Sequence, residues 1–179
     1  VSYGGYTDWR VPSIKELYSL MDFRGGDPSS YSADDEAGLT PFIDTNYFGF
    51  GYGDTDAGER LIDAQMVTST LYVDGTMGGD ETVFGVNFAD GRIKGYGLTL
   101  NGSDKTFFVQ CVRGDTGYGV NDLEDTGEQS VIDWATGLMW TKADGGVGMD
   151  WEAALDWAQQ KNAENYLGHD DWRLPDAKE

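Results

Sequence analysis

Apolar and polar residues alternate with a period of two along the middle of the chain. This pattern predicts four β-strands, over residues 65–73, 82–88, 92–100 and 106–113. Asp90 and Gly91 separate the second strand from the third, and this pair is typical of a two-residue hairpin turn. Apolar residues occupy both faces of segment 106–113, so we expect a strand covered on both sides, with Cys111 buried and reduced. Two shorter strands are expected over 131–133 and 138–141.

Two segments have the spacing of amphipathic helices. Ile14, Leu17, Tyr18 and Met21 form one apolar stripe behind a capping pair, Ser13 and Glu16. A second helix is predicted over 151–163, with Asp150 as its cap and with Trp151, Ala154, Leu155 and Ala158 on one face. Residues 22–63 predict a long irregular segment, and its many aromatic residues indicate that it packs against the rest of the chain.

The chain contains an internal repeat. Residues 3–16 return as residues 166–179 at an offset of 163, and 8 of the 16 positions that overlap at this offset, 1–16 with 164–179, are identical. The chain therefore spans one period of a tandem array plus a short overlap. Each copy holds a Trp-Arg pair, then a proline and the start of a helix, and we expect a structural role for the Trp-Arg pair.

Composition excludes several classes of function. The net charge of −20 at pH 7, with 12 basic residues that form no cluster, argues against binding to nucleic acids or anionic membranes. No run of 18 apolar residues is present, so we expect no membrane insertion of this segment. One Cys and one His cannot build a common zinc site or an intrachain disulfide.

Several motifs together resemble the bacterial family named after the C-terminal domain of the collagen-like adhesin Lcl. They are residues 136–140, 151–155 and 171–175, which resemble the opening of the family pattern, and residues 8–12, 62–70, 84–91 and 109–113, which resemble its continuation. The resemblance implies an α+β, C-type-lectin-like fold, similar to that of formylglycine-generating enzymes. In such a fold, two helices pack against a small, twisted, mostly antiparallel sheet with a long irregular loop region.

The order of these motifs predicts the domain organisation. Residues 1–113 correspond to the C-terminal half of one repeat, residues 114–130 form a Gly/Asp-rich connector, and residues 131–179 correspond to the N-terminal half of the next repeat. Exposed apolar strands seek partners, so we expect segment 131–141 to dock beside segment 106–113, in the same chain or in a neighbour. Docking within the chain would leave the second motif copy peripheral, with Trp172 more exposed than Trp9.

Two functions fit these features. The first is a non-enzymatic, extracellular or cell-surface module that binds a glycan or another surface ligand through its long loop, for which Tyr47, Phe50 and Tyr52 are the candidate residues. The alternative is a structural repeat that self-associates into a surface stalk or filament, with further copies of the repeat as partners. Formylglycine-generating chemistry requires paired cysteines, which a chain with one Cys lacks, so we expect no enzyme activity.

Calcium is the one cofactor that the sequence suggests. Asp54, Asp56 and Glu59 lie in a Gly-flanked loop and supply the oxygen ligands that Ca²⁺ prefers. Their spacing is not that of an EF-hand, and most clusters in a chain with 32 carboxylates are solvated surface.

Overall fold

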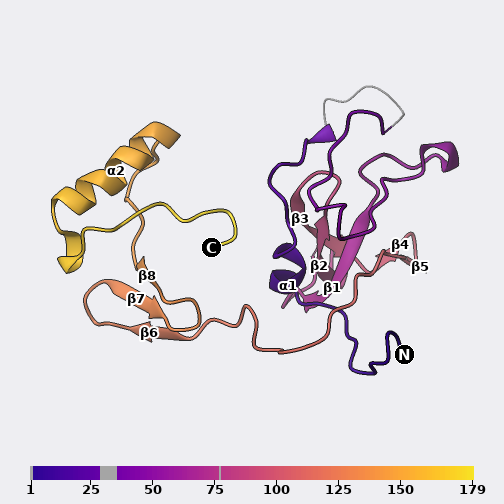
Figure 1. Cartoon of the computed structure of the whole chain (residues 1–179), viewed down its shortest axis with the longest axis horizontal. Helices are drawn as coiled ribbons and strands as arrows, with labels where there is room; N and C mark the ends of the chain where they lie inside the picture. The colour runs from indigo at the N-terminus through magenta and orange to yellow at the C-terminus, as the bar shows by residue number, and fades with distance from the viewer. Residues whose placement is uncertain (1, 29–35, 77) are drawn as a thin grey trace. The chain divides into compact units, whose positions relative to one another are not determined.

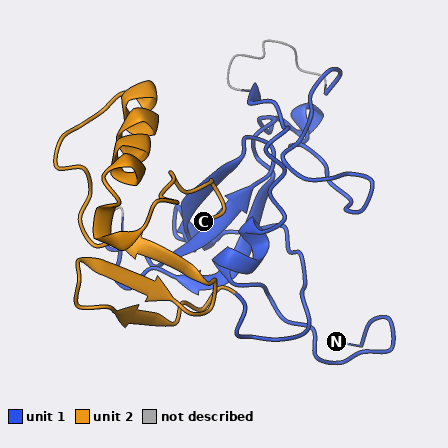
Figure 2. Ribbon diagram, turned by 60° about the vertical axis from the view of Figure 1, so that its left-hand side comes forward, with its two compact units in different colours: residues 1–118 blue, residues 119–179 orange. Residues whose placement is uncertain are grey.

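The computed structural model divides the chain into residues 1–118 (unit 1) and residues 119–179 (unit 2), which Figure 2 colours separately. The structure describes residues 2–28, 36–76 and 78–179. Residues 29–35, which belong to the predicted irregular segment, therefore lie outside the described residues. The boundary between the units falls within the predicted connector, which itself contains strand β6 (Leu123–Asp125). Within the described residues, no helix has the length and apolar character needed to span a membrane.

Unit 1 is built on an antiparallel sheet with the strand order β1-β2-β3 (Figure 1). These strands are β1 (Gln65–Leu71), β2 (Thr82–Asn87) and β3 (Arg92–Gly97), and a small hairpin adds β4 (Thr99–Leu100) and β5 (Ser103–Asp104). The first three predicted strands are confirmed. The turn after β2 has four residues instead of the predicted two, because Asn87 pairs with Arg92 and Phe88 is fully buried in the core.

Helix α1 (Ile14–Tyr18) covers this sheet with its apolar side. Ser13 caps its N-terminus, and the capping pair of Ser13 and Glu16 is present as predicted. The core of unit 1 consists of Leu17, Met21, Ile43, Met66, Val86 and Phe88. Aromatic residues of the irregular segment pack against this core, namely Phe42, Phe48 and Phe50. The segment also includes the 3-10 helix η2 (Thr55–Ala57).

Segment 106–113 does not form the predicted strand. It makes only isolated bridges, between Phe108 and Met66 and between Val112 and Arg10. Phe108, Val109 and Cys111 are exposed, so the expectation of a segment covered on both faces with a buried Cys111 is wrong for unit 1. The segment has the apolar pattern of a covered strand, but the described residues of unit 1 cover only some of its side chains.

Unit 2 combines a second antiparallel sheet with the longer helix. The strand order is β6-β7-β8, with β7 (Ser130–Asp133) in the centre and β8 (Leu138–Thr141) at one edge. Helix α2 (Trp151–Ala163) is capped by Asp150, whose carboxylate accepts a hydrogen bond from the amide of Ala153 at 2.8 Å. The 3-10 helix η3 (Tyr166–Gly168) follows it. The predicted hairpin and helix are both confirmed, and the two units together are of the α+β class.

Unit 2 has very little hydrophobic core. Among the described residues of this unit, Ala158 is the one buried apolar residue. Trp151 and Leu155, which share the predicted apolar face of α2 with Ala158, are exposed. The best-buried group is instead Asp133, which accepts hydrogen bonds from the amides of Asp122 and Ala135, and these bonds lower its pKa. A unit of this size that leaves its apolar residues uncovered lacks much of the burial that normally stabilises a domain.

Candidate functional site

The first copy of the repeated motif forms a small hydrogen-bonded turn in unit 1. The indole nitrogen of Trp9 donates to the carbonyl oxygen of Tyr3 at 2.9 Å. The two terminal nitrogens of Arg10 donate to the two carboxylate oxygens of Glu16 at 2.6 and 2.5 Å. Glu16 also accepts from the amide of Ser13 at 2.8 Å. The motif therefore fixes the direction in which the chain enters α1.

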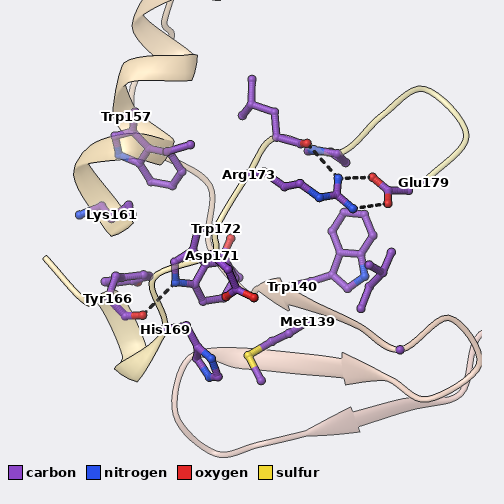
Figure 3. A pocket seen from close by; sticks show the side chains of 16 residues that line it. Met139, Trp140, Trp157, Lys161, Tyr166, His169, Asp171, Trp172, Arg173 and Glu179 are labelled. Atoms are coloured by element: carbon purple, nitrogen blue, oxygen red, sulfur yellow. Dashed lines mark hydrogen bonds and ion pairs between the residues drawn. The ribbon is translucent and has the colours of Figure 1, made fainter. Parts of the chain in front are cut away.

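The second copy forms the same bonds in unit 2 (Figure 3). The indole of Trp172 donates to the carbonyl oxygen of Tyr166 at 2.9 Å, and Arg173 makes a two-pronged pair with Glu179 at 2.6 and 2.5 Å. Glu179 also accepts from the amide of Asp176 at 2.7 Å. These residues lie 163 positions after their counterparts, so the repeat seen in sequence is also a repeat in hydrogen bonding.

Both copies hold their glutamate in the ionised form. The hydrogen bonds from Arg10 lower the pKa of Glu16 to about 2, and the amide of Ser13 contributes in the same direction. The hydrogen bonds from Arg173 lower the pKa of Glu179 to about 2 as well. A carboxylate that accepts several hydrogen bonds beside a guanidinium is stabilised in its charged state.

The two copies differ in the neighbours that hold them. In unit 1, the amide and carbonyl of Arg10 bond to Val112, and the carbonyl of Pro12 accepts from the amide of Ser69 in β1. In unit 2, the side chain of Asn162 in α2 bonds to both the amide and the carbonyl of Trp172, at 2.7 and 2.9 Å. One motif is thus attached to a sheet and the other to a helix.

The two copies also differ in which of their residues are buried. Pro12 is buried, whereas its counterpart Pro175 is exposed. At the preceding position the order is reversed, because Leu174 is half-buried and its counterpart Val11 is exposed. Each unit therefore leaves part of the same motif uncovered.

An open pocket of about 400 Å³ lies beside the second copy, within unit 2 (Figure 3). Strand β8, helix α2 and the motif each contribute to its wall. The apolar lining includes Trp140, Trp157, Tyr166, Trp172, Leu174 and Pro175, and the polar lining includes Lys161, His169, Asp171 and Glu179. This pocket was not predicted from the sequence, although five of the six tryptophans lie within residues 131–179 and their clustering indicates an aromatic site there.

A groove of about 420 Å³ lies beside the first copy, within unit 1. Its apolar lining includes Pro12, Leu17, Leu20, Phe48, Val112 and Tyr118, and Glu16 and Cys111 also line it. The counterparts of Pro12 and Glu16 are Pro175 and Glu179, which line the pocket of unit 2. The pocket and the groove therefore share two equivalent positions of the motif.

The candidate ligand-binding residues of the long loop do not form one exposed surface. Tyr47 is 83% exposed. Phe50 packs against the core and makes an edge-on contact with Tyr52, with ring centroids 5.1 Å apart. The hydroxyl of Tyr52 is buried, and burial raises its pKa. Of the three, Tyr47 alone presents its ring to solvent.

The candidate calcium ligands have other roles in the loop. The Asp54 carboxylate caps η2 by accepting from the amide of Ala57, and Glu59 accepts from the amide of Asp54 at 2.9 Å. In the part of the chain that the structure describes, no three His, Cys, Asp or Glu side chains are grouped so as to hold a metal ion. Calcium binding by Asp54, Asp56 and Glu59 stays a prediction from sequence.

Comparison with known proteins identifies the family. The model of the Lcl C-terminal domain matches residues 1–113 and 129–179. This chain belongs to the Lcl C-terminal domain family. No curated protein and no solved structure matches the chain. The two matched segments each contain one copy of the Trp-Arg motif, and residues 114–128 between them are unmatched.

Proposed function

We propose that this chain is a non-enzymatic structural repeat of an extracellular, surface-located bacterial protein, and that copies of the repeat associate into a stalk or filament. The observation that carries this proposal is the duplicated motif, which makes the same hydrogen bonds in both units but is only partly covered in each. Two half-covered copies in one chain are the arrangement expected of a repeat whose parts are completed by further copies.

The thin core of unit 2 supports the same proposal. Exposed tryptophan and leucine side chains on α2 represent apolar surface that monomeric proteins usually bury. We further propose that the completed domain has the C-type-lectin-like arrangement, with α1 and α2 as its two helices. Those helices belong to different units of this chain.

Association of the purified chain tests this function. We expect sedimentation velocity between 1 and 200 µM to show species larger than a monomer whose fraction rises with concentration, and electron microscopy to show linear assemblies. A monomer of 19.6 kDa across the whole range would contradict the proposal.

A second candidate function is the binding of an uncharged glycan. The pocket of unit 2 favours it, because Trp140, Trp157 and Trp172 lie close to the polar groups of Lys161 and Asp171. Sulfated glycans are unfavourable ligands for a chain with a net charge of −20. Binding to neutral but not sulfated glycans on an array, lost in the variant Trp157→Ala and retained in Tyr47→Ala, would favour this candidate. Repeating the assay with a chelator would test the predicted role of calcium.

A further inference from the structure

We propose that two copies of this chain join on the motif itself, with unit 2 of one copy and unit 1 of a second copy packed on opposite sides of a single Trp-Arg turn. This inference rests on the proposed self-association and adds the surface that performs it. In an array with a period of 163 residues, the motif lies between the two halves along the chain, so one copy of the motif serves both.

The hydrogen bonds to the two copies are compatible with one shared motif. Unit 2 bonds to the backbone of Trp172 through Asn162. Unit 1 bonds to the backbone of later positions, at Arg10 and Pro12, through Val112 and Ser69. The two sets use different backbone atoms of the motif, so a single motif can make both sets at once.

Each unit also leaves a different position of the motif exposed. Leu174 is half-buried in unit 2, whereas its counterpart Val11 is 37% exposed in unit 1, and Pro12 is buried in unit 1, whereas its counterpart Pro175 is exposed in unit 2. Packing both units on one motif would cover both positions. It would also merge the pocket of unit 2 with the groove of unit 1 into one interior, because both are lined by the same proline and glutamate positions.

Exposed apolar side chains on both units would contribute to such an interface. Phe108, Val109 and Tyr118 in unit 1 and Trp151 and Leu155 in unit 2 are all exposed. These side chains offer roughly 500 Å² of apolar surface, about a third of the ~1,600 Å² that a specific interface buries. The linings of the pocket and the groove add to this area. Because the surfaces on the two partners differ, the contact is head-to-tail and can continue into an open chain of copies.

In separate chains, each junction contains two copies of the motif, and one must be displaced. Residues 3–16 lead directly into α1, so their place in unit 1 is fixed by the chain. In that case the pocket of unit 2 exchanges its own residues 171–179 for the equivalent residues 8–16 of the second copy. Val11 then takes the half-buried position that Leu174 occupies in the separate unit.

The single cysteine provides a probe of this contact. Cys111 is exposed and lines the groove of unit 1, so docking of a second copy would cover it. We expect its labelling rate with a bulky maleimide to fall at least tenfold as the chain associates. A cysteine at Ser103, an exposed position in β5, serves as the control in the double variant Cys111→Ser/Ser103→Cys, and its rate should not change.

Two matched substitutions test the role of the motif. Val11→Asp places a charge at the position that docking would bury, and it should abolish both association and the protection of Cys111. Val73→Asp makes the same change at a fully exposed position and should affect neither. Because Val11 is already 37% exposed in unit 1, both variants should fold, and circular dichroism checks this.

The possible outcomes distinguish the shared motif from self-association, the proposed function on which it rests. Association with an unchanged Cys111 rate would overturn the shared motif and leave self-association standing. A monomer with a reactive Cys111 at every concentration would overturn both. A monomer whose Cys111 is protected at every concentration would mean that the halves complete each other within one chain, which also overturns docking of a second copy.

Discussion

The ion pair between Arg10 and Glu16 gives the most quantitative test of the motif as a structural element. The substitution Glu16→Gln removes the charge but keeps the size of the side chain and an oxygen acceptor. The Glu16 side chain is 9% exposed, and its pKa is lowered from 4.5 to about 2. A difference of this size corresponds to about 3 kcal/mol at ~1.4 kcal/mol per pKa unit.

Solvent reduces this value, because the Arg10 side chain is 28% exposed. We therefore expect Glu16→Gln to lower the free energy of unfolding of unit 1 by about 2 kcal/mol at pH 7. For a unit of this size, the melting temperature should fall by roughly 6–10 °C. The assay is urea and thermal unfolding followed by circular dichroism.

The pH dependence has a defined sign. The pKa of Glu16 in the folded chain lies below its value in the unfolded chain, so the stabilisation is complete above pH 4.5 and is lost as the pH falls toward 2. The difference between wild type and variant should therefore shrink by more than half between pH 7 and pH 3. Glu179→Gln is the matched control, because it removes the same ion pair from unit 2 and should leave the unfolding of unit 1 unchanged. A loss below 0.5 kcal/mol at pH 7, or a difference at pH 3 as large as that at pH 7, would refute this reasoning.

Two further predictions concern the sheet of unit 1 and the charge of the chain. A Cβ atom at Gly85 would lie 2.4 Å from the Tyr96 ring and 2.6 Å from the carbonyl oxygen of Met66, so Gly85→Ala should destabilise unit 1 by about 1–3 kcal/mol in urea unfolding. The control Gly49→Ala, which meets no atom within 4 Å, should change stability by less than about 0.5 kcal/mol, and equal effects of the two variants would contradict the packing of β2 against β3. Units 1 and 2 each carry a net charge of −10, so association should strengthen when NaCl rises from 50 to 500 mM, as measured by sedimentation. Dissociation by salt would instead indicate that ion pairs drive the contact.

Local signals in the sequence were sufficient for the elements whose stability is local. Helix α2 begins after Asp150 and covers the predicted residues because its cap and its apolar spacing act within the helix. The hairpin of β7 and β8 follows for the same reason, since its strands and turn are adjacent in sequence. The sequence repeat showed which residues form the motif, and the structure showed the hydrogen bonds that they make.

Features that depend on distant neighbours were not predictable in this way. Segment 106–113 has the pattern of a buried strand, but the described residues of unit 1 leave Cys111 exposed. The aromatic residues around Tyr52 indicated a binding loop in the sequence. That Tyr52 contacts Phe50, which packs against the core, could be known only from the fold. The pocket of unit 2 was missed because its lining comes from a strand, a helix and the motif.

The central claim is that unit 2 of one repeat and unit 1 of the next form one domain around a shared motif. A chain of two repeats in phase, residues 1–179 followed directly by residues 17–179, contains one such complete junction. Hydrogen exchange of α2 in both repeats, at a concentration below that of association, tests the claim most directly. The substitution Glu152→Asp in the first repeat gives its peptides a distinct mass. The account predicts that α2 of the first repeat, which is followed by a unit 1, exchanges at least tenfold more slowly than α2 of the second. Equal exchange rates in the two helices would contradict it.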